Sequence, residues 1–416
     1  MTRTFHAALV AATCFIGLAA PVAAQQPTQR QVDSLRAQLR ALRARLDSIL
    51  TALGQRPPSP APPGGDDLAA LRAAAAAAVG RDTLRAADTA SERKFVGRER
   101  NQAQLNPEIG VTGDIRGYAT ARGVQRDNFD PREFEIGFQS ALDPYSHTKI
   151  FVSIEGEVTS LEEGYAYWTG LPGRVRLDVG KFRQQFGELN RWHLHAVPET
   201  EYPLALTSYL GEDGLVGTGI SLYRAFGGFG THELMAQVTR SASDGELFGD
   251  GGRPTYLAHL LNFWQLGRSA YMQIGGTALY GTNPDSALRT RVGGLEFRLT
   301  WRPPARALYR EWTLRGEVLA LQKEVAGVGP TRLGGYVSTT YKLNQRFIAG
   351  VRYDYVEAPE FGVITRQVIP SLTMWQSEWV FLRAQYQLQR VASATATHQL
   401  ALQAVWAIGP HKHETY

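Results

Sequence analysis

The feature that most constrains the fold is a two-residue alternation of apolar with polar or small residues, which recurs from about Pro107 to the C-terminus. In one such segment Phe134, Ile136 and Phe138 fall on the same face. A period of two is the signature of a β-strand, because successive side chains point to opposite faces. Clusters of Gly, Pro, Asp and Asn separate the segments. About sixteen segments fit the pattern: residues 107–120, 131–141, 147–157, 160–169, 174–181, 215–226, 230–240, 254–265, 269–281, 288–301, 310–322, 331–342, 345–356, 363–376, 379–390 and 397–409.

The polar face of these segments is rich in charge. Arg352 and Asp354, for example, alternate with Val351, Tyr353 and Tyr355. A soluble β protein, the alternative, also alternates, but sixteen long strands with charged faces suit the wet lumen of a membrane barrel. The sequence therefore predicts an all-β protein, with a transmembrane antiparallel β-barrel of about 16 strands over residues 107–416. Aromatic residues near the strand ends resemble the girdles of such barrels: Tyr118, Tyr167, Trp168, Tyr256, Trp264, Tyr271, Trp301, Trp312, Tyr341, Trp379 and Trp406.

The lengths of the connections also indicate a barrel. If both barrel ends lie in the periplasm, connections after odd strands face outward and should be longer than those after even strands. Long stretches at 122–130 and 241–253 follow odd segments, and short turns such as "LPG" and "GGFG" follow even ones. Two connections break the rule, because the odd one near Thr159 is short and the even one, "RPPARALYR", is long.

Residues 1–24 are predicted to be a secretory signal peptide. Arg3 and His6 give a positive start, residues 7–20 form an apolar run, and "VAA" at 22–24 supplies the cleavage pattern. The run is too short for a transmembrane helix, and a buried N-terminal helix is the alternative. The single cysteine, Cys14, lies in this segment, so the exported chain would have no disulfides. A closed, hydrogen-bonded barrel is another source of stability.

Residues 25–53 are predicted to contain a short coiled coil, followed by a Pro/Ala-rich linker over 54–106. The apolar positions alternate in steps of three and four, which fills the core positions of three heptads and indicates an oligomer. A lone amphipathic surface helix is the alternative. The heptad residues are Val32, Leu35, Leu39, Leu42, Leu46, Ile49 and Leu53.

The net charge of +5 and the pI near 9.2 would ordinarily favour nucleic-acid binding. Here basic and acidic residues nearly balance and are dispersed along an exported chain. We therefore expect no nucleic-acid partner.

The arrangement resembles that of bacterial outer-membrane porins. A signal peptide, a short coiled coil, a linker and a terminal barrel are similar to the phosphate-selective (O/P-type) porins. Three stretches also resemble uncharacterised outer-membrane barrels: "GKFRQQFGELNRWHLHAVP" at 180–198, "LGEDG" at 210–214 and "GPHKHETY" at 409–416. Some of those barrels are labelled TonB-dependent, but the residues before this barrel hold no plug-sized globular domain.

The resemblance implies a porin in the outer membrane that passes small hydrophilic solutes or ions. It further implies outer-membrane lipid as a partner, a homo-oligomer that is a trimer by preference, and a coiled coil in the periplasm. The C-terminal strand, which ends at Tyr416, would engage the barrel-assembly machinery. A structural tether through the coiled coil, and a metal-linked uptake or receptor barrel, are the alternatives.

The connection 182–213 is about 30 residues long, far longer than a hairpin needs, and so long a loop is usually functional. It follows the fifth predicted strand, and in porins this third outward loop folds inward and narrows the pore. A sixteen-stranded barrel leaves an aqueous channel unless something enters it. Charged side chains in such a constriction set selectivity. The predicted constriction residues are Arg183, Glu188, Arg191, His193, His195, Glu199, Glu201, Glu212 and Asp213.

A metal site is the alternative for this stretch. His193 and His195, one residue apart, would lie on one side of an extended segment, and a carboxylate could complete a zinc-like set. No third ligand stands at a motif spacing, so they are weak candidates and no metal is expected. His411 and His413 repeat the spacing in a C-terminal tail. Neither an enzyme nor a cofactor is expected, because no Gly-x-Ser-x-Gly elbow occurs and Ser208 is isolated.

The wall of the pore is predicted to include Arg116, Arg174, Arg176 and Asp178. By alternation, inward basic and acidic residues nearly balance along the barrel, so no ion preference follows. A register slip of one residue would reverse every such assignment.

Overall fold

The computed structural model describes residues 107–121, 127–242, 247–248, 253–284, 288–325, 329–392 and 394–409. The predicted signal peptide, coiled coil and linker lie outside these residues, as do His411, His413 and Tyr416.

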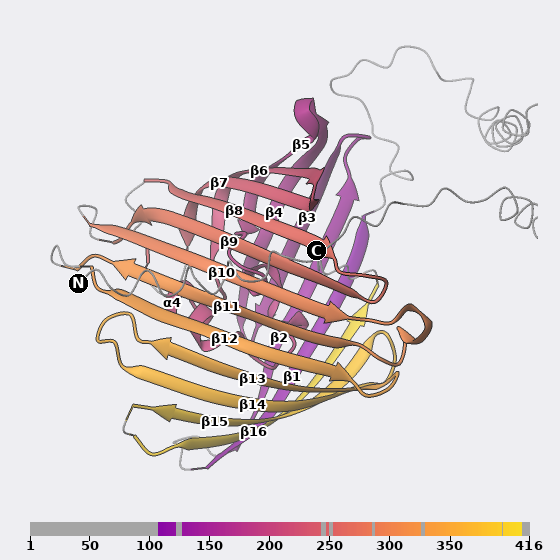
Figure 1. The fold of residues 1–416 in the computed structure, drawn as a ribbon, viewed down its shortest axis with the longest axis vertical. Coiled ribbons are helices and arrows are strands. Elements are labelled where there is room, and N and C mark those ends of the chain that lie inside the picture. Colours follow the sequence, from indigo (N-terminus) through magenta and orange to yellow (C-terminus); the bar gives the residue numbers. More distant parts are fainter. Residues whose placement is uncertain are drawn as a thin grey trace, which may run out of the picture. The chain divides into compact units, whose positions relative to one another are not determined.

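The described residues form sixteen antiparallel strands that close into one barrel through the pairing of β1 with β16 (Figure 1). The prediction of an all-β, antiparallel barrel of about sixteen strands is confirmed. The strands are β1 (Glu108–Ala121), β2 (Asp127–Ala141), β3 (Ser146–Glu155), β4 (Val158–Leu171), β5 (Val175–Arg183), β6 (Val216–Gly228), β7 (Gly230–Ala242), β8 (Thr255–Gln265), β9 (Ala270–Thr282), β10 (Arg289–Trp301), β11 (Trp312–Lys323), β12 (Thr331–Lys342), β13 (Phe347–Glu357), β14 (Ile364–Trp375), β15 (Val380–Val391) and β16 (Thr397–Ile408).

The alternation along each strand sorts apolar side chains to the outside and polar ones to the inside. On β10, Leu295 is 69% exposed, whereas the neighbouring Glu296 is 7% exposed. On β13, Val351 is 40% exposed and Arg352 is fully buried. This is the reverse of a soluble sandwich, whose apolar faces meet in a core. Among the described residues, no helix is both long and apolar enough to cross a membrane.

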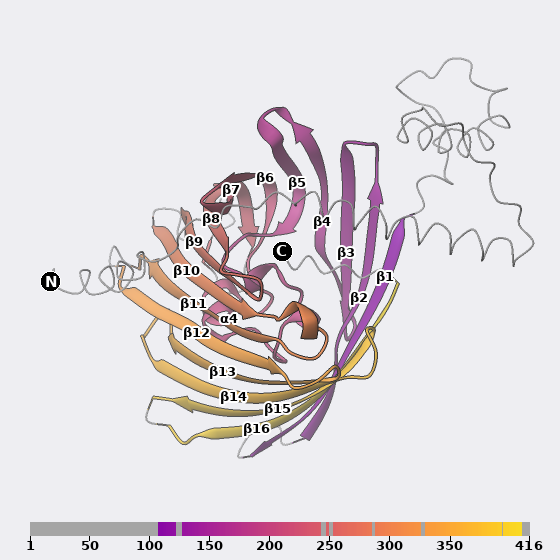
Figure 2. The same ribbon diagram turned by 45° about the vertical axis from the view of Figure 1, so that its right-hand side comes forward.

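The long connection between β5 and β6, residues 184–215, lies inside the barrel, and we call it the inner segment. It contains two 3₁₀ turns, η4 (Leu189–Arg191) and η5 (Leu194–Ala196), and one helix, α4 (Leu204–Leu210). Figure 2 shows α4 within the curve of the sheet, where it contacts β12 and β13. The remaining 3₁₀ turns, η3 (Pro172–Arg174) and η6 (Pro304–Arg306), join consecutive strands.

The inner segment has its own hydrophobic core against one side of the barrel. Phe186, Leu189, Leu206, Leu210 and Leu215 are each no more than 1% exposed. They pack against inward-facing apolar residues of β8, β9, β10, β11 and β13, which we call the apolar wall. The apolar wall consists of Leu257, Leu279, Val292, Leu319, Leu321 and Val356.

A glycine on β12 allows α4 to approach this strand closely. A Cβ atom on Gly334 would lie 2.9 Å from the Cβ of Ala205 and 3.0 Å from the ring of Tyr209. Both distances are too short for a relaxed van der Waals contact, so a side chain here would push the helix away from the wall.

Candidate functional site

The inner segment is closed at its neck by one buried amide. Asn190, 1% exposed, donates from Nδ2 to the carbonyl oxygens of Gln184 (2.8 Å) and Leu215 (3.0 Å). Its Oδ1 accepts from the backbone N–H of Leu215 at 2.7 Å. These three hydrogen bonds, together with the one from the Gln184 N–H to the Leu215 carbonyl oxygen at 3.0 Å, join the two ends of the segment, which folds as a closed loop.

The stretch 198–202 ("PETEY") lies against buried arginines of β2, β13 and β15. Arg352 donates to the Glu199 carboxylate at 2.8 Å and to the carbonyl oxygens of Glu201 (2.8 Å) and Tyr202 (3.3 Å). Arg383 donates to the carbonyl oxygen of Glu199 at 2.6 Å. Because a guanidinium presents its donors in a fixed plane, these bonds set the position of the stretch along the barrel.

A third arginine and an amide complete the binding of this stretch. Arg132 on β2 donates to the carbonyl oxygen of Thr200, and the N–H of Thr200 donates to Gln385 on β15 at 3.0 Å. Thr200 is 1% exposed. Both backbone groups of this buried residue are therefore satisfied by the barrel wall, as burial requires.

A carboxylate on β11 holds the start of the inner segment. Glu317 accepts from the backbone N–H groups of Glu188 and Leu189, each at 3.1 Å, and from the Tyr336 hydroxyl at 2.9 Å. The Glu188 carboxylate in turn accepts from Arg298 on β10 at 2.7 Å. The segment is thus bonded to strands on several sides of the barrel.

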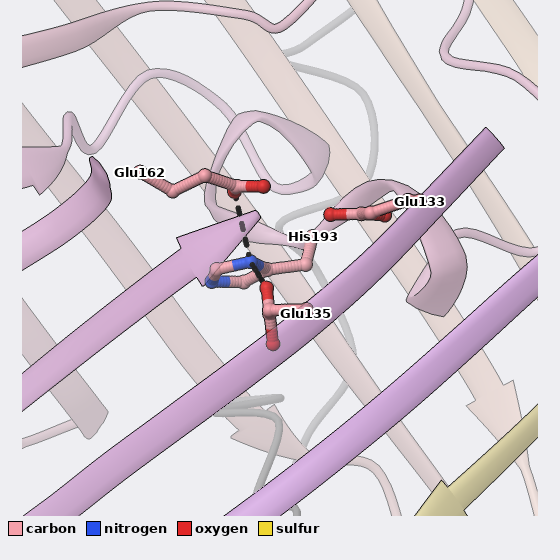
Figure 3. A group of neighbouring side chains, drawn as sticks. All are labelled: Glu133, Glu135, Glu162 and His193. Carbon is pink, nitrogen blue, oxygen red and sulfur yellow. Dashed lines mark ion pairs between the residues drawn. The ribbon is translucent and has the colours of Figure 1, made fainter. Parts of the chain in front are cut away.

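His193 sits among carboxylates of β2 and β4 (Figure 3). Its Nδ1 lies 2.5 Å from Glu135 Oε2 and 3.1 Å from Glu162 Oε2, and its Nε2 lies 3.5 Å from Glu163 Oε2. Glu133, Glu135, Glu162 and His193 each offer a ligand atom, and these four atoms lie within 4.8 Å of one another. Three carboxylates and one imidazole are a donor set that can hold a divalent metal ion.

His195 makes a separate contact. Its Nδ1 lies 3.1 Å from Glu133 Oε2, and its ring centre lies 5.9 Å from that of His193. The two histidines thus face neighbouring carboxylates on β2, Glu133 and Glu135, whose side chains share one face of the strand. His195 stands beside the donor set rather than in it.

The carboxylates raise the pKa of both imidazoles. For His193, burial acts to lower the pKa, but the charge of Glu135 and hydrogen bonds to Glu135, Glu162 and Glu163 outweigh it and hold the pKa well above its usual value. For His195, burial again opposes the change, and the Glu133 carboxylate raises the pKa.

Two β-bulges explain why so many charged side chains meet here. Between β3 and β4 the register shifts, with Phe151 opposite Glu163 and Val152 opposite Leu161. Glu162 is the extra residue, so it turns inward beside Glu163 instead of outward. The signal in the sequence is the pair of adjacent glutamates in "SLEEGYAY" (160–167), which strict alternation cannot place on one face.

The second bulge lies on β2. Asp114 of β1 pairs with Glu133 and Arg116 pairs with Asp130, so β2 has one residue more than β1 between these pairs. Pro131 falls in the bulge, where a strand tolerates proline, and both Arg132 and Glu133 are buried. This places Arg132 against Thr200 while Glu133 contacts His195.

The predicted constriction residues occupy different environments. Arg183 is 4% exposed and donates to Glu162 at 2.8 Å and to the carbonyl oxygen of Asp213 at 2.6 Å. Arg191 donates to Gln185 at 3.0 Å. The side chains of Glu212 and Asp213 are exposed at the return of the loop. The other predicted residues contact the barrel as described above: Glu188, His193, His195 and Glu199 through their side chains, and Glu201 through its carbonyl and its pair with Arg116.

The predicted lining residues also differ. Arg116 pairs with Asp130 at 3.2 Å, and Arg176 donates to Asp178 at 2.7 Å. Arg174 lies in the turn η3 with an exposed side chain. Sequence reasoning did not select Asn190, Glu162 or Glu163 as site residues.

A cavity of about 110 Å³ lies between the inner segment and β5 to β10. Trp192 lines it, with the Arg315 guanidinium carbon 5.1 Å from the centre of its ring. Its charged lining is nearly balanced. Three arginines and four acids contribute: Arg176, Arg191, Arg298, Asp178, Glu188, Glu233 and Glu296.

Comparison with known proteins finds one relative by sequence and several solved structures with a similar fold. No protein-family model matches the chain. An uncharacterized protein of Aquifex aeolicus is 24% identical over 305 residues, which cover 65% of this chain. The match spans about 64% of the length of that relative.

Solved structures with similar folds are outer-membrane proteins. An anion-selective porin from Comamonas acidovorans is similar with a TM-score of 0.52 and 9% identity, covering 73% of this chain and 100% of the porin. The outer membrane channel DcaP of Acinetobacter baumannii gives a TM-score of 0.52 and 10% identity, with 75% and 100% covered. A trimer form of OmpT from Vibrio cholerae gives 0.50 and 11%, with 73% and 99% covered. At such low identity the likeness shows the fold alone, and that fold is the closed sixteen-stranded barrel seen in outer-membrane porins.

Proposed function

We propose that the protein is an outer-membrane porin that lets small hydrophilic solutes or ions diffuse across the membrane, and that the inner segment narrows its lumen. The observation that carries the proposal is the sorting of side chains by the closed barrel. Apolar residues such as Leu295 and Leu402 are exposed outside, while Glu296, Arg315 and Asp354 point inward. The apolar outer surface is stable in contact with lipid tails. The charged inner surface needs water or polar side chains around it.

The inner segment supports the narrowing. It bonds to β1, β2, β4, β10, β11, β13 and β15, so it crosses the lumen instead of following one strand. The cavity beside it, where Trp192 lies, is the space through which a solute would pass. Because the charges that line the cavity are nearly balanced, we expect weak selectivity between anions and cations.

Assembly and location belong to the same proposal. One structure with the same fold is a trimer form, so a homotrimer in the outer membrane is proposed for this chain. The proposal extends to contact with outer-membrane lipid, a periplasmic coiled coil at residues 25–53, and insertion by the barrel-assembly machinery through the C-terminal strand.

Single-channel conductance in a planar bilayer tests the proposal. The purified barrel should give discrete steps, and steps in groups of three would indicate a trimer. Trp192→Ala should raise the conductance of each step, because it removes an indole from the lining of the cavity while the neck and the contacts of Arg132, Arg352 and Arg383 remain. Deletion of residues 187–209 should raise it further.

Phe226→Ala serves as the matched control, because this aromatic side chain is exposed on β6 and lies outside the lining of the cavity. It should leave the conductance unchanged. A folded barrel that stays silent in all four forms would overturn the porin proposal. Loss of envelope attachment on deletion of residues 25–106, with a silent barrel, would favour the tether instead.

A further inference from the structure

We propose that Glu133, Glu135, Glu162 and His193 form a binding site for one divalent transition-metal ion, such as Zn²⁺, which fastens the inner segment to β2 and β4. The donors come from three separate parts of the chain. Figure 3 shows their side chains pointing toward one another from β2, β4 and the segment. Zinc binding is measured on the folded barrel whatever its conductance, so the proposal does not rest on the porin function.

The distances suit a metal site that closes on its ion. The four ligand atoms lie within 4.8 Å of one another. A tetrahedral ion with ligands at about 2.1 Å separates them by roughly 3.4 Å. Glu162 Oε2 lies 3.1 Å from His193 Nδ1, already near this separation. Glu135 Oε2, at 2.5 Å from the same nitrogen, needs to move away by about an ångström, which glutamate torsions allow.

The charge balance also favours a cation. Four carboxylates meet here, because Glu163 adjoins the three donors; Glu133, Glu135 and Glu163 are buried and Glu162 is partly buried. The guanidinium of Arg183, which donates to Glu162 at 2.8 Å, and the imidazoles of His193 and His195 lie against them. Buried carboxylates are costly unless paired with cations or metal ions. A divalent ion would supply two positive charges at the centre of the group.

Neighbouring groups would orient the ligands. Arg183 bonds to the Glu162 carboxylate, and His195 contacts Glu133. Partners of this kind hold metal ligands in place and raise metal affinity. The β4 bulge brings Glu162 into the set, and the β2 bulge lies immediately before Glu133. The backbone of both strands thus departs from regular pairing where the donors meet.

The donor types select among ions. Imidazole suits zinc, iron and nickel, and carboxylates suit manganese and magnesium as well. Calcium takes six to eight oxygen ligands, so one nitrogen among four donors disfavours it. We therefore expect Zn²⁺ to bind more tightly than Ca²⁺.

Isothermal titration with zinc chloride provides the test, with bound metal counted by mass spectrometry. The protein is the folded barrel after treatment with a chelator, in a background of His411→Gln and His413→Gln that removes the histidines of the C-terminal tail. One zinc ion should bind per chain. Glu135→Gln and His193→Gln should each weaken the affinity by at least about tenfold, because loss of a neighbouring group alone costs about 10- to 100-fold.

His398→Gln on β16 and Glu378→Gln in the turn between β14 and β15 are the matched controls, since both side chains lie outside the donor set. They should leave the affinity unchanged. If a variant fails to fold, hydrogen exchange of the protein with its four donors intact gives a second readout. Zinc should slow exchange over residues 189–197 in that protein. Absence of stoichiometric zinc binding, or equal affinity in the Glu135→Gln, His193→Gln and control proteins, would overturn the proposal.

Discussion

The inner segment meets two unlike parts of the barrel wall, and β13 contributes to both. On one side, Leu206 and Leu210 pack against the apolar wall. On the other, residues 198–202 are bonded to Arg132, Arg352 and Arg383, which we call the arginine wall. Apolar burial is strong but without direction, and buried hydrogen bonds are directional. The apolar wall therefore holds the segment inside without fixing its position, and the arginine wall determines where along the barrel it rests.

The largest expected effect comes from breaking the arginine wall. Arg352→Met leaves the Glu199 carboxylate and two carbonyl groups without their donor in a buried site, and removal of one partner of such a pair costs about 3–5 kcal/mol. Denaturant unfolding of the refolded barrel measures this loss of stability. Hydrogen exchange should show it first in residues 198–204.

Arg366→Met is the control, because Arg366 lies exposed on the outer face of β14. It should change the unfolding free energy little. If Arg366→Met lowered the unfolding free energy as much as Arg352→Met, the effect would come from the loss of any arginine and not from the buried contacts of Arg352.

The second-largest loss of stability is expected from a change in the contact with the apolar wall. Leu206 is 1% exposed, and Leu→Ala at such a site costs about 2–5 kcal/mol through lost burial and a cavity. Because this contact has no direction, we expect the segment to lose stability without a change in its position. The same unfolding measurement checks it.

Leu260→Ala on β8 provides the comparison, since this leucine points outward and is 41% exposed. Its substitution should cost less than Leu206→Ala. A shift of the histidine contacts in Leu206→Ala, seen as faster exchange at residues 192–196, would contradict the division of roles.

Breaking the neck, where Asn190 joins the two ends of the inner segment, should cost less stability than breaking either wall. Asn190→Ala removes three hydrogen bonds and leaves the backbone N–H of the buried Leu215 without its acceptor, whereas the carbonyl groups of Gln184 and Leu215 keep backbone donors. An unsatisfied buried group costs about 1–3 kcal/mol. Exchange should accelerate at residues 184–190 and 211–215 while both walls stay protected. Equal acceleration at 198–202 would show that the neck, not the arginine wall, positions that stretch.

The contrast between the walls also explains what could be predicted from the sequence. Alternation gave the strands, because each strand must present apolar residues to the outside, and Val175–Arg183 and Val216–Gly228 differ from the expected 174–181 and 215–226 by only one or two residues at each end. The length and charge of 182–213 marked the connection that enters the barrel. These are local features of the chain.

The partners of the inner segment could not be predicted in this way. The contact of Glu199 with Arg352 joins residues 153 positions apart, and no local pattern encodes it. Glu162 turns inward only because of a bulge, which breaks the period of two on which inward and outward assignments depend. The apolar wall left a weaker trace: "YLAHLLNFW" on β8 is apolar on both faces, and Leu257 faces the segment.

The smallest effect is expected where the arginine contacts reach solvent. Arg116 on β1 pairs with Glu201 and Asp130, whose side chains are 41% and 36% exposed. Exposed pairs contribute about 0–1 kcal/mol and are screened by salt. Arg116→Gln should therefore cost no more than about 1 kcal/mol at low salt, and less at high salt, whereas the loss in Arg352→Met should hardly depend on salt. Denaturant unfolding of both variants at low and at high salt measures the two losses of stability. If both losses fell equally with salt, water would reach Arg352 as freely as Arg116, and the arginine wall could not fix the position of the segment.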